Sequence, residues 1–287
     1  MTSRADPIRR TAGLAFTVLI GVLGAPRPAP AADGGELELA SHRAIYDLKL
    51  ADSRGRRQLS DVRGRIVYDF SGNTCEGYSL QFRQVTELDN GEGKVVVSDL
   101  RSATWEEGDA KNYRFNFQNY LSERLVDSVD GRAARGSQAT AVSLIQPESK
   151  KFDLDHTVVF PTEHIRRIVL AARAGQSLLQ LPVYDGSETG EKLYDTLTVI
   201  GQPIAPDGHQ VDDAAAGQTA LASMKRWPVT VSYFDHGKQG GEQTPVYSIR
   251  FELYENGVSR ALVLDYGDFS ISGTMSTLEM RDSKPCN

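Results

Sequence analysis

Apolar and polar residues alternate with a period of two in the stretch from Val246 to Met280. This spacing is typical of β-strands that bury one face. Asn256-Gly257 favours a two-residue type I′ turn, because both residues tolerate a positive φ. Such a turn predicts the cross-strand pairs Glu255–Val258, Leu253–Arg260, Phe251–Leu262, Ile249–Leu264 and Tyr247–Tyr266.

A second tight turn is predicted at Gly267-Asp268. This turn predicts the pairs Tyr266–Phe269, Leu264–Ile271 and Leu262–Gly273. Both turns place the same side chains on one face, which is apolar except for Arg260. The stretch is therefore predicted to be a three-stranded antiparallel meander.

Similar alternation recurs along the chain and predicts roughly twelve to fourteen strands in all. A turn is predicted at Asp130-Gly131, and Asp195 is placed in the buried row of its strand. The other predicted strands cover residues 42–50, 64–70, 78–88, 94–105, 113–117, 121–130, 137–146, 193–199 and 229–233.

Helical spacing is found at one place, after Phe160-Pro161. Ile165, Ile168, Val169 and Ala172 recur at i, i+3, i+4 and i+7 and predict one buried helix face, with Gly175 ending the helix. Residues 202–221 are predicted to be a loop with one short helix.

The predicted fold is all-β with one main α-helix. A sheet of this many strands must twist and curl, close, or split into two layers. We expect a curled antiparallel sheet that forms a spiral-like open barrel around or against the helix, with a concave face of the kind that commonly holds ligands. Two smaller half-barrels that share edges are the alternative.

Residues 1–31 have the pattern of a secretory signal peptide, with arginines at the front, an apolar run from Ala12 to Ala25 and a small-x-small site at 29–31. Its removal leaves residues 32–287 as one predicted periplasmic domain. The net charge of the whole chain is −6, and the part after the signal is more acidic still. No basic block survives to follow phosphates, so nucleic acid is not an expected partner.

The only two cysteines are Cys75 and Cys286. An even pair in an oxidising compartment favours a disulfide, with two free thiols or an intermolecular bond as the alternatives.

Candidate chemistry is sparse, and no catalytic, metal-binding or cofactor-binding residues are predicted. His156 and His164 are close in sequence to several acidic residues, but they flank a strand-to-helix junction and are expected to cap or pack. The run Gly186–Gly190 has its serine one position too early for a nucleophile elbow. Arg166, Arg167 and Arg173, followed by Tyr184, either meet a lipid headgroup or an acidic peptide or form a solvated helix face.

Several motifs in order resemble those of the EipB-type family of cell-envelope integrity proteins. The motifs are Phe160-Pro161-Thr162-Glu163-His164, Asp185-Gly186-Ser187, Trp227-Pro228-Val229, Tyr233-Phe234-Asp235, Glu255-Asn256-Gly257-Val258 and Leu264-Asp265-Tyr266-Gly267-Asp268-Phe269. The resemblance covers residues 40–287. It implies a periplasmic monomer with a spiral-like open barrel around a helix, and one disulfide, carried here by Cys75 and Cys286.

The expected function is a non-enzymatic role in envelope integrity, through binding of a lipid, a lipoprotein segment or a peptide in the concave face. The ligand-binding residues are not identified by the sequence. An envelope hydrolase with a dispersed site, and a scaffold that docks other envelope proteins, are the alternatives.

Overall fold

The computed structural model describes residues 37–54, 59–206, 212–237, 243–283 and 286. All of them belong to one compact unit that spans residues 36–287. The predicted signal peptide, residues 1–31, lies outside the described residues. Among the helices of the described segments, none is long and apolar enough to cross a membrane.

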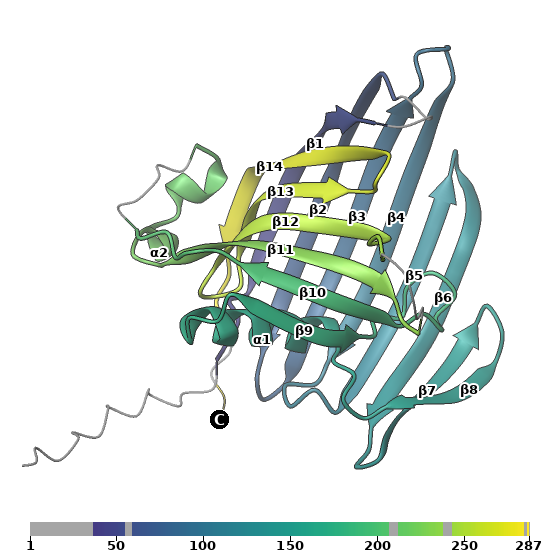
Figure 1. The fold of residues 1–287 in the computed structure, drawn as a ribbon, viewed down its shortest axis with the longest axis vertical. Coiled ribbons are helices and arrows are strands. Elements are labelled where there is room, and N and C mark those ends of the chain that lie inside the picture. Colours follow the sequence, from purple (N-terminus) through teal and green to yellow (C-terminus); the bar gives the residue numbers. More distant parts are fainter. Residues whose placement is uncertain (1–36, 55–58, 207–211, 238–242, 284–285, 287) are drawn as a thin grey trace, which may run out of the picture. The chain divides into compact units, whose positions relative to one another are not determined.

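Fourteen strands of the described residues form one antiparallel sheet in the order β8-β7-β6-β5-β4-β3-β2-β1-β14-β13-β12-β11-β10-β9 (Figure 1). The first eight are β1 (His42–Ser53), β2 (Asp61–Asn73), β3 (Gly77–Asp89), β4 (Val95–Glu106), β5 (Asn112–Leu121), β6 (Arg124–Arg135), β7 (Ala139–Gln146) and β8 (Lys150–Asp155). The last six are β9 (Leu178–Val183), β10 (Tyr194–Ile200), β11 (Arg226–Asp235), β12 (Tyr247–Tyr254), β13 (Ser259–Asp265) and β14 (Phe269–Met280). The helices are α1 (Pro161–Arg173), a 3₁₀ turn η1 (Ala214–Gly217) and α2 (Thr219–Ala222).

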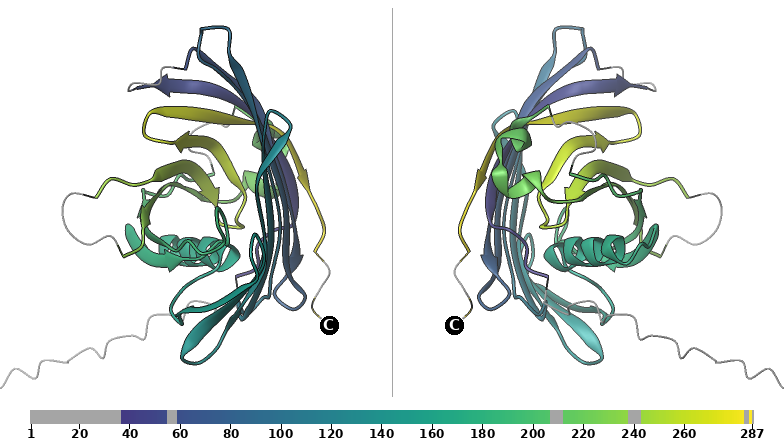
Figure 2. Two further views of the ribbon diagram at one scale, coloured as in Figure 1. Left: turned by 90° about the vertical axis from the view of Figure 1, so that its right-hand side faces the viewer. Right: turned by 90° about the vertical axis from the view of Figure 1, so that its left-hand side faces the viewer.

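The sheet doubles back on itself at the pairing of β1 with β14. Strands β9–β13 run across the strands β2–β5 that lie behind them, and they curl around α1 (Figures 1 and 2). The edge strands β8 and β9 do not pair with each other. A single parallel bridge from Val159 to Val183 joins the segment after β8 to β9. The predicted curled, open, antiparallel sheet with one main helix is confirmed.

Helix α1 begins and ends where the sequence predicts. Its N-cap residue, Phe160, gives no side-chain hydrogen bond, and the buried Glu106 carboxylate of β4 accepts instead from the backbone N–H groups of Thr162 and Glu163, both at 2.7 Å. Gly175 ends the helix with φ +72°, a conformation that glycine adopts without a steric penalty. The carboxylate of another strand therefore supplies the cap that the local sequence lacks.

The hairpin between β12 and β13 departs from the predicted two-residue turn. Tyr254 pairs with Val258, which makes a three-residue loop whose last residue, Gly257, has φ +90°. A β-bulge follows at Ala261, with φ +52°, and it restores the predicted pair Ile249–Leu264. The predicted pairs Glu255–Val258 and Leu253–Arg260 are wrong, because the longer loop shifts the register by one residue until the bulge.

The shift moves Arg260 to the other face of the sheet. It pairs there with Glu252, and its guanidinium binds the carboxylates of Glu252 at 2.5 Å and Asp213 at 2.8 Å. A buried guanidinium on the apolar face would lack such partners, at a large energetic cost. The turn at Gly267-Asp268 is as predicted, with the pairs Leu264–Ile271 and Leu262–Gly273.

Two further predictions are corrected by the strand boundaries. Asp130-Gly131 lies inside β6 and not in a turn; a Cβ on Gly131 would come within 2.6 Å of the Phe115 ring, so close packing explains this glycine. Asp195 lies on the exposed face of β10, whereas the predicted outer row, with Thr196 and Thr198, is buried.

The described residues contain two apolar clusters. The larger one packs the α1 residues Ile168, Val169, Ala171 and Ala172 together with side chains of β1, β2 and β11–β14. The smaller one packs Phe160 and Tyr184 with side chains of β5–β7. Helix α1 therefore buries its predicted face inside the curl of the sheet.

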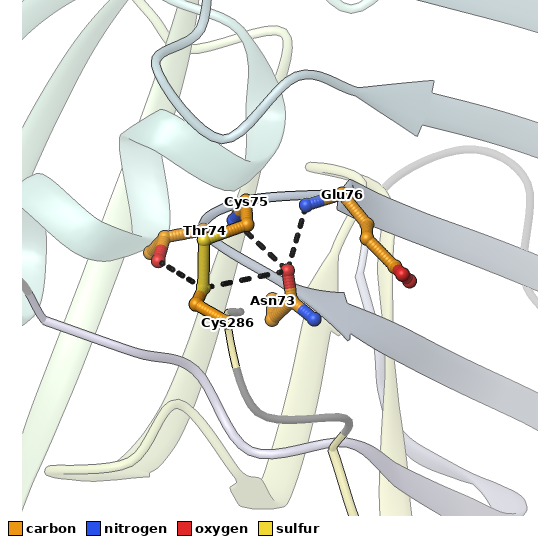
Figure 3. The surroundings of a disulfide bond; sticks show 5 residues. All are labelled: Asn73, Thr74, Cys75, Glu76 and Cys286. Carbon is orange, nitrogen blue, oxygen red and sulfur yellow. Dashed lines mark hydrogen bonds between the residues drawn. A yellow bond between two sulfur atoms is a disulfide. The ribbon is translucent and has the colours of Figure 1, made fainter.

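Cys75 and Cys286 form a disulfide, with their Cα atoms 5.8 Å apart (Figure 3). Cys75 lies in the turn between β2 and β3. The Asn73 carboxamide oxygen accepts from the backbone N–H groups of Cys75 at 2.8 Å and Glu76 at 2.7 Å, which orders that turn (Figure 3). The bond joins residues 211 positions apart.

Candidate functional site

A cavity of about 620 Å³ lies on the concave side of the sheet. Strands β1–β6 supply one wall, strands β10–β13 supply the other, and α1 contributes Ile165 and Ile168. This volume lies in the range of small-molecule binding sites. The cavity follows from the curl: the inward rows of both halves face each other, and one helix does not fill the space between them.

One wall carries a row of tyrosines, which we call the tyrosine ladder: Tyr194 in β10, Tyr233 in β11, Tyr247 in β12 and Tyr266 directly after β13. All four line the cavity. The rings of Tyr233 and Tyr247 stack with their centroids 4.4 Å apart, and the neighbouring ring pairs lie at 5.8 Å and 6.4 Å. Such cross-strand rows arise when residues of the same face are in register.

The opposite wall is also aromatic and aliphatic. Tyr68 and Phe82 are direct cross-strand partners, and Phe117 continues the same row two strands further along. Ile66 and Leu100 lie in the next row along these strands and also line the cavity. The cavity therefore presents apolar surface on both sides, with polar groups at a few places.

His164, from α1, is one of these polar groups. Its Nε2 lies 3.5 Å from the hydroxyl of Thr196, which donates to the Leu181 carbonyl. Burial lowers the pKa of His164 to about 4, and the nearby Glu163 opposes this only in part. Burial also lowers the pKa of His42. Both imidazoles are therefore neutral near pH 7.

Acidic groups gather where the turn 185–190 meets the cavity. Asp185 accepts from the backbone N–H of Ser187 at 2.9 Å, and Glu188 accepts from the Tyr194 hydroxyl at 2.5 Å and pairs with Lys192 at 2.9 Å. Burial raises the pKa of Asp185 despite the hydrogen bonds from Ser187. Gly186, at φ +74°, lies against the Phe115 ring and fixes the path of the turn.

The residues singled out from the sequence do not converge on a reactive centre. His156 is exposed beside Asp155, whereas His164 is buried. Within the described residues, no group of three or more metal-ligating side chains is found. No hydrogen bond of the described chain joins His164 to Ser187 or Asp185, so the three do not form a catalytic triad.

The predicted basic face of α1 is also not a single surface. Arg166 donates to the Gly108 carbonyl at 2.6 Å, Arg167 binds Glu163 at 2.6 Å, and Arg173 donates to the Glu255 carbonyl at 3.1 Å. Tyr184 is fully buried. These contacts help to hold α1 in place. Arg167 and Arg173 are still exposed, as the solvated-face alternative predicts, whereas Arg166 is half-buried.

The residues that line the cavity were not predicted as a group from the sequence. The apolar face that carries Tyr247 and Tyr266 was predicted, and Tyr233 was placed in an alternating strand, but nothing local indicates that these rings join Tyr194. Asp185 was read only as a turn residue, because its burial depends on strands more than 40 positions away.

Comparisons with known proteins agree with this architecture. The cell envelope integrity protein EipB of Brucella abortus (strain 2308) is 37% identical over 247 residues, which cover 86% of each protein. The crystal structure of a β-barrel-like protein from Brucella abortus matches with a TM-score of 0.78 and 36% identity, over 86% of this chain and 100% of that one. The sequence profile of the EipB-like family matches residues 34–282. The chain is therefore a member of the EipB-like family.

Proposed function

We propose that this protein maintains the integrity of the cell envelope from the periplasm, as a non-enzymatic protein that holds an apolar ligand in its concave cavity. The observation that carries the proposal is the cavity of about 620 Å³ between two aromatic walls. A lipid chain, an acylated lipoprotein segment or an apolar peptide would be shielded from water there.

The envelope role comes from the relatives. The homologue in Brucella abortus is named a cell envelope integrity protein, and this chain aligns with 86% of it. The pattern of residues 1–31 and the disulfide between Cys75 and Cys286 favour a secreted, oxidising location. Because no hydrogen bond of the described residues joins Ser187 to a histidine of the cavity, we favour binding over hydrolysis.

Ligand binding is tested by thermal unfolding of the purified protein with decanol, lysophosphatidylcholine, an N-acylated lipoprotein peptide and an unacylated apolar peptide. A ligand at 100 times its Kd stabilises by about 2.7 kcal/mol, which corresponds to a rise in Tm of about 5–10 °C for a chain of this size. If no class of ligand changes the Tm, the cavity is not a binding site.

Ile165→Trp is the matched test of the site, with Leu170→Trp as its control. Ile165 lines the cavity, whereas Leu170 lies on the same helix and is 48% exposed. The bulkier indole at position 165 narrows the cavity and is expected to reduce the ligand-induced rise in Tm, while Leu170→Trp retains it. Equal responses of the two variants would place the ligand elsewhere.

The same pair of variants tests the envelope role in cells. A strain that lacks the gene is expected to be sensitive to detergents, and the wild-type gene and Leu170→Trp are expected to restore resistance. Ile165→Trp is expected to fail although it is present at the wild-type level. Full complementation by Ile165→Trp would separate the envelope role from the cavity.

A further inference from the structure

The cavity has an uneven set of charges. Asp127, Asp185 and Glu188 line it, and no lysine or arginine is found among the described residues that do so. The two lining histidines, His42 and His164, have pKa values lowered by burial and are neutral near pH 7. An anionic group that enters the cavity would therefore lose its hydration without gaining a cationic partner.

Asp185 is the least exposed of these three acidic groups. Within the described residues it forms no ion pair, and its nearest contacts are the backbone N–H and hydroxyl of Ser187. Lys192, close to this turn, is already bound to Glu188 at 2.9 Å and to Asp235 at 3.1 Å. Part of Asp185 is open to the cavity. Its carboxyl group can therefore accept a cationic donor that the protein itself does not provide.

The tyrosine ladder lies beside this carboxyl group. Tyr194, at one end of the ladder, donates its hydroxyl to Glu188 of the same turn at 2.5 Å, and the ring centroids of Tyr233 and Tyr247 follow at 5.8 Å and 4.4 Å. Aromatic faces attract ammonium groups, and tyrosine rings next to a carboxylate are a favourable surface for them. Beyond the ladder, the lining becomes aliphatic, with Ile249 and Leu264 of β12 and β13.

We propose that the cavity selects single-chain amphiphiles that carry an ammonium head group. The ammonium group binds at Asp185 beside the tyrosine ladder, and the alkyl chain lies along Ile249, Leu264 and Ile168. This inference rests on the proposed function and names the chemical class of its ligand.

Three probes with the same alkyl chain test the selection: decylammonium, decanol and decanoate, below their micelle concentrations and measured by isothermal titration calorimetry. Decylammonium is expected to bind about tenfold more tightly than decanol, which is about 1.4 kcal/mol, because a hydrogen bond to a charged group is stronger than one between neutral groups. Decanoate is expected to bind more weakly than decanol.

Asp185→Asn tests the assigned residue. Asparagine keeps an oxygen acceptor for the Ser187 N–H, so the turn is expected to be preserved and the Tm is not expected to fall. The preference for decylammonium over decanol is expected to be lost, while the affinity for decanol stays the same. Asp195→Asn is the control, because it removes the same charge from the exposed face of β10; it is expected to retain the preference.

The possible outcomes separate the two proposals. Equal binding of the three probes, tighter binding of decanoate, or a preference that survives Asp185→Asn would overturn the ligand class and leave a binding cavity in place. Absence of binding by all three, together with no response to the wider ligand panel, would overturn the proposed function as well.

Discussion

Glu106 shows how much a single side chain contributes to the placement of α1. Glu106 is the last residue of β4, yet it accepts two of the backbone N–H groups at the start of the helix that have no partner within the helix. Burial raises the pKa of Glu106 to about 7, although both backbone hydrogen bonds favour the charged form. The carboxyl group therefore holds its proton to a higher pH in the folded protein than in the unfolded chain.

Glu106→Gln is expected to change the pH dependence of stability. Between about pH 4.5 and 7 the folded wild type binds more protons than the unfolded chain, so its free energy of unfolding falls as the pH rises, by on the order of 3 kcal/mol. Glutamine does not titrate, and this fall is expected to disappear. At pH 5 the variant is expected to be less stable by about 1–2 kcal/mol, because its amide nitrogen cannot accept. Urea unfolding at several pH values measures both effects; a slope equal to that of the wild type would contradict the role of Glu106.

His164 is expected to act in the opposite direction. Its pKa is lowered to about 4 by burial, so between about pH 6.5 and 4 the unfolded chain binds a proton that the folded protein does not. The free energy of unfolding then falls as the pH is lowered through this range, by on the order of 3 kcal/mol. His164→Gln is expected to remove this fall in acid unfolding experiments, with the exposed His156→Gln as the control. A steep loss of stability that persists in His164→Gln would contradict the assignment.

These residues also mark the limit of sequence-based inference at this scale. The residue types at 160–164 correctly predicted the start of a helix, because capping and proline preferences are local. The actual cap, Glu106, is more than 50 positions away, and no local signal connects the two. Asp185 was recognised as a turn residue for the same local reasons, while its place in the cavity depends on the register of distant strands.

Strand β10 is the element whose buried face was predicted wrongly from the sequence. The alternation rule assigns the more hydrophobic residues of a strand to its buried face. Leu197 and Val199 were therefore predicted to be buried, and the threonines between them were not. In the structure Thr196 and Thr198 are buried, and only Thr196 has a partner, the Leu181 carbonyl at 2.8 Å. The Thr198 hydroxyl has no hydrogen-bond partner within the described residues.

Thr198→Val is expected to stabilise the protein, and Thr196→Val to destabilise it. Valine has the shape of threonine, so each change tests one hydroxyl. Removal of the unpaired Thr198 hydroxyl is expected to raise the free energy of unfolding by about 1 kcal/mol. Loss of the Thr196 hydroxyl leaves the Leu181 carbonyl short of one donor and is expected to lower it by about 1 kcal/mol. Chemical unfolding of both variants measures the difference, and an equal effect of the two substitutions would show that hydrogen bonding does not decide this row.

The β12–β13 hairpin shows how a partly wrong local prediction can give the right sheet. The loop has one residue more than predicted on its β12 side, and the bulge at Ala261 adds one residue on the β13 side. The two changes cancel, so Ile249 still faces Leu264 and the apolar face survives. The buried pattern was therefore a better guide to register than the turn type, because burial constrains the whole strand.

At the scale of the whole unit, the sheet has to be held in a curl without closing. The edge strands β8 and β9 do not pair with each other. Near these two edges, the parallel bridge between Val159 and Val183 connects the two halves of the sheet. The curl itself was predictable, because fourteen strands in one twisted sheet cannot remain flat. The crossing of the two halves, and hence the cavity, was not predictable, because it depends on the packing of side chains from β1 and β2 with those from β11–β14 and α1, which no local pattern encodes.

The disulfide acts on the unit as a whole, because it joins the β2–β3 turn to the C-terminal end of the chain over 211 positions. Closing a loop of this length restricts the unfolded chain by up to about 5 kcal/mol, and native disulfides typically contribute about 2–4 kcal/mol. The double variant Cys75→Ser/Cys286→Ser is expected to lose that much stability, which lowers the Tm by roughly 5–15 °C. The bond should matter little for the curl, since β1 still pairs with β14 next to it. Thermal unfolding with and without reductant measures this: reductant lowers the Tm of the wild type and leaves that of the double variant unchanged, and equal Tm values for both proteins would show that the bond does not stabilise the fold.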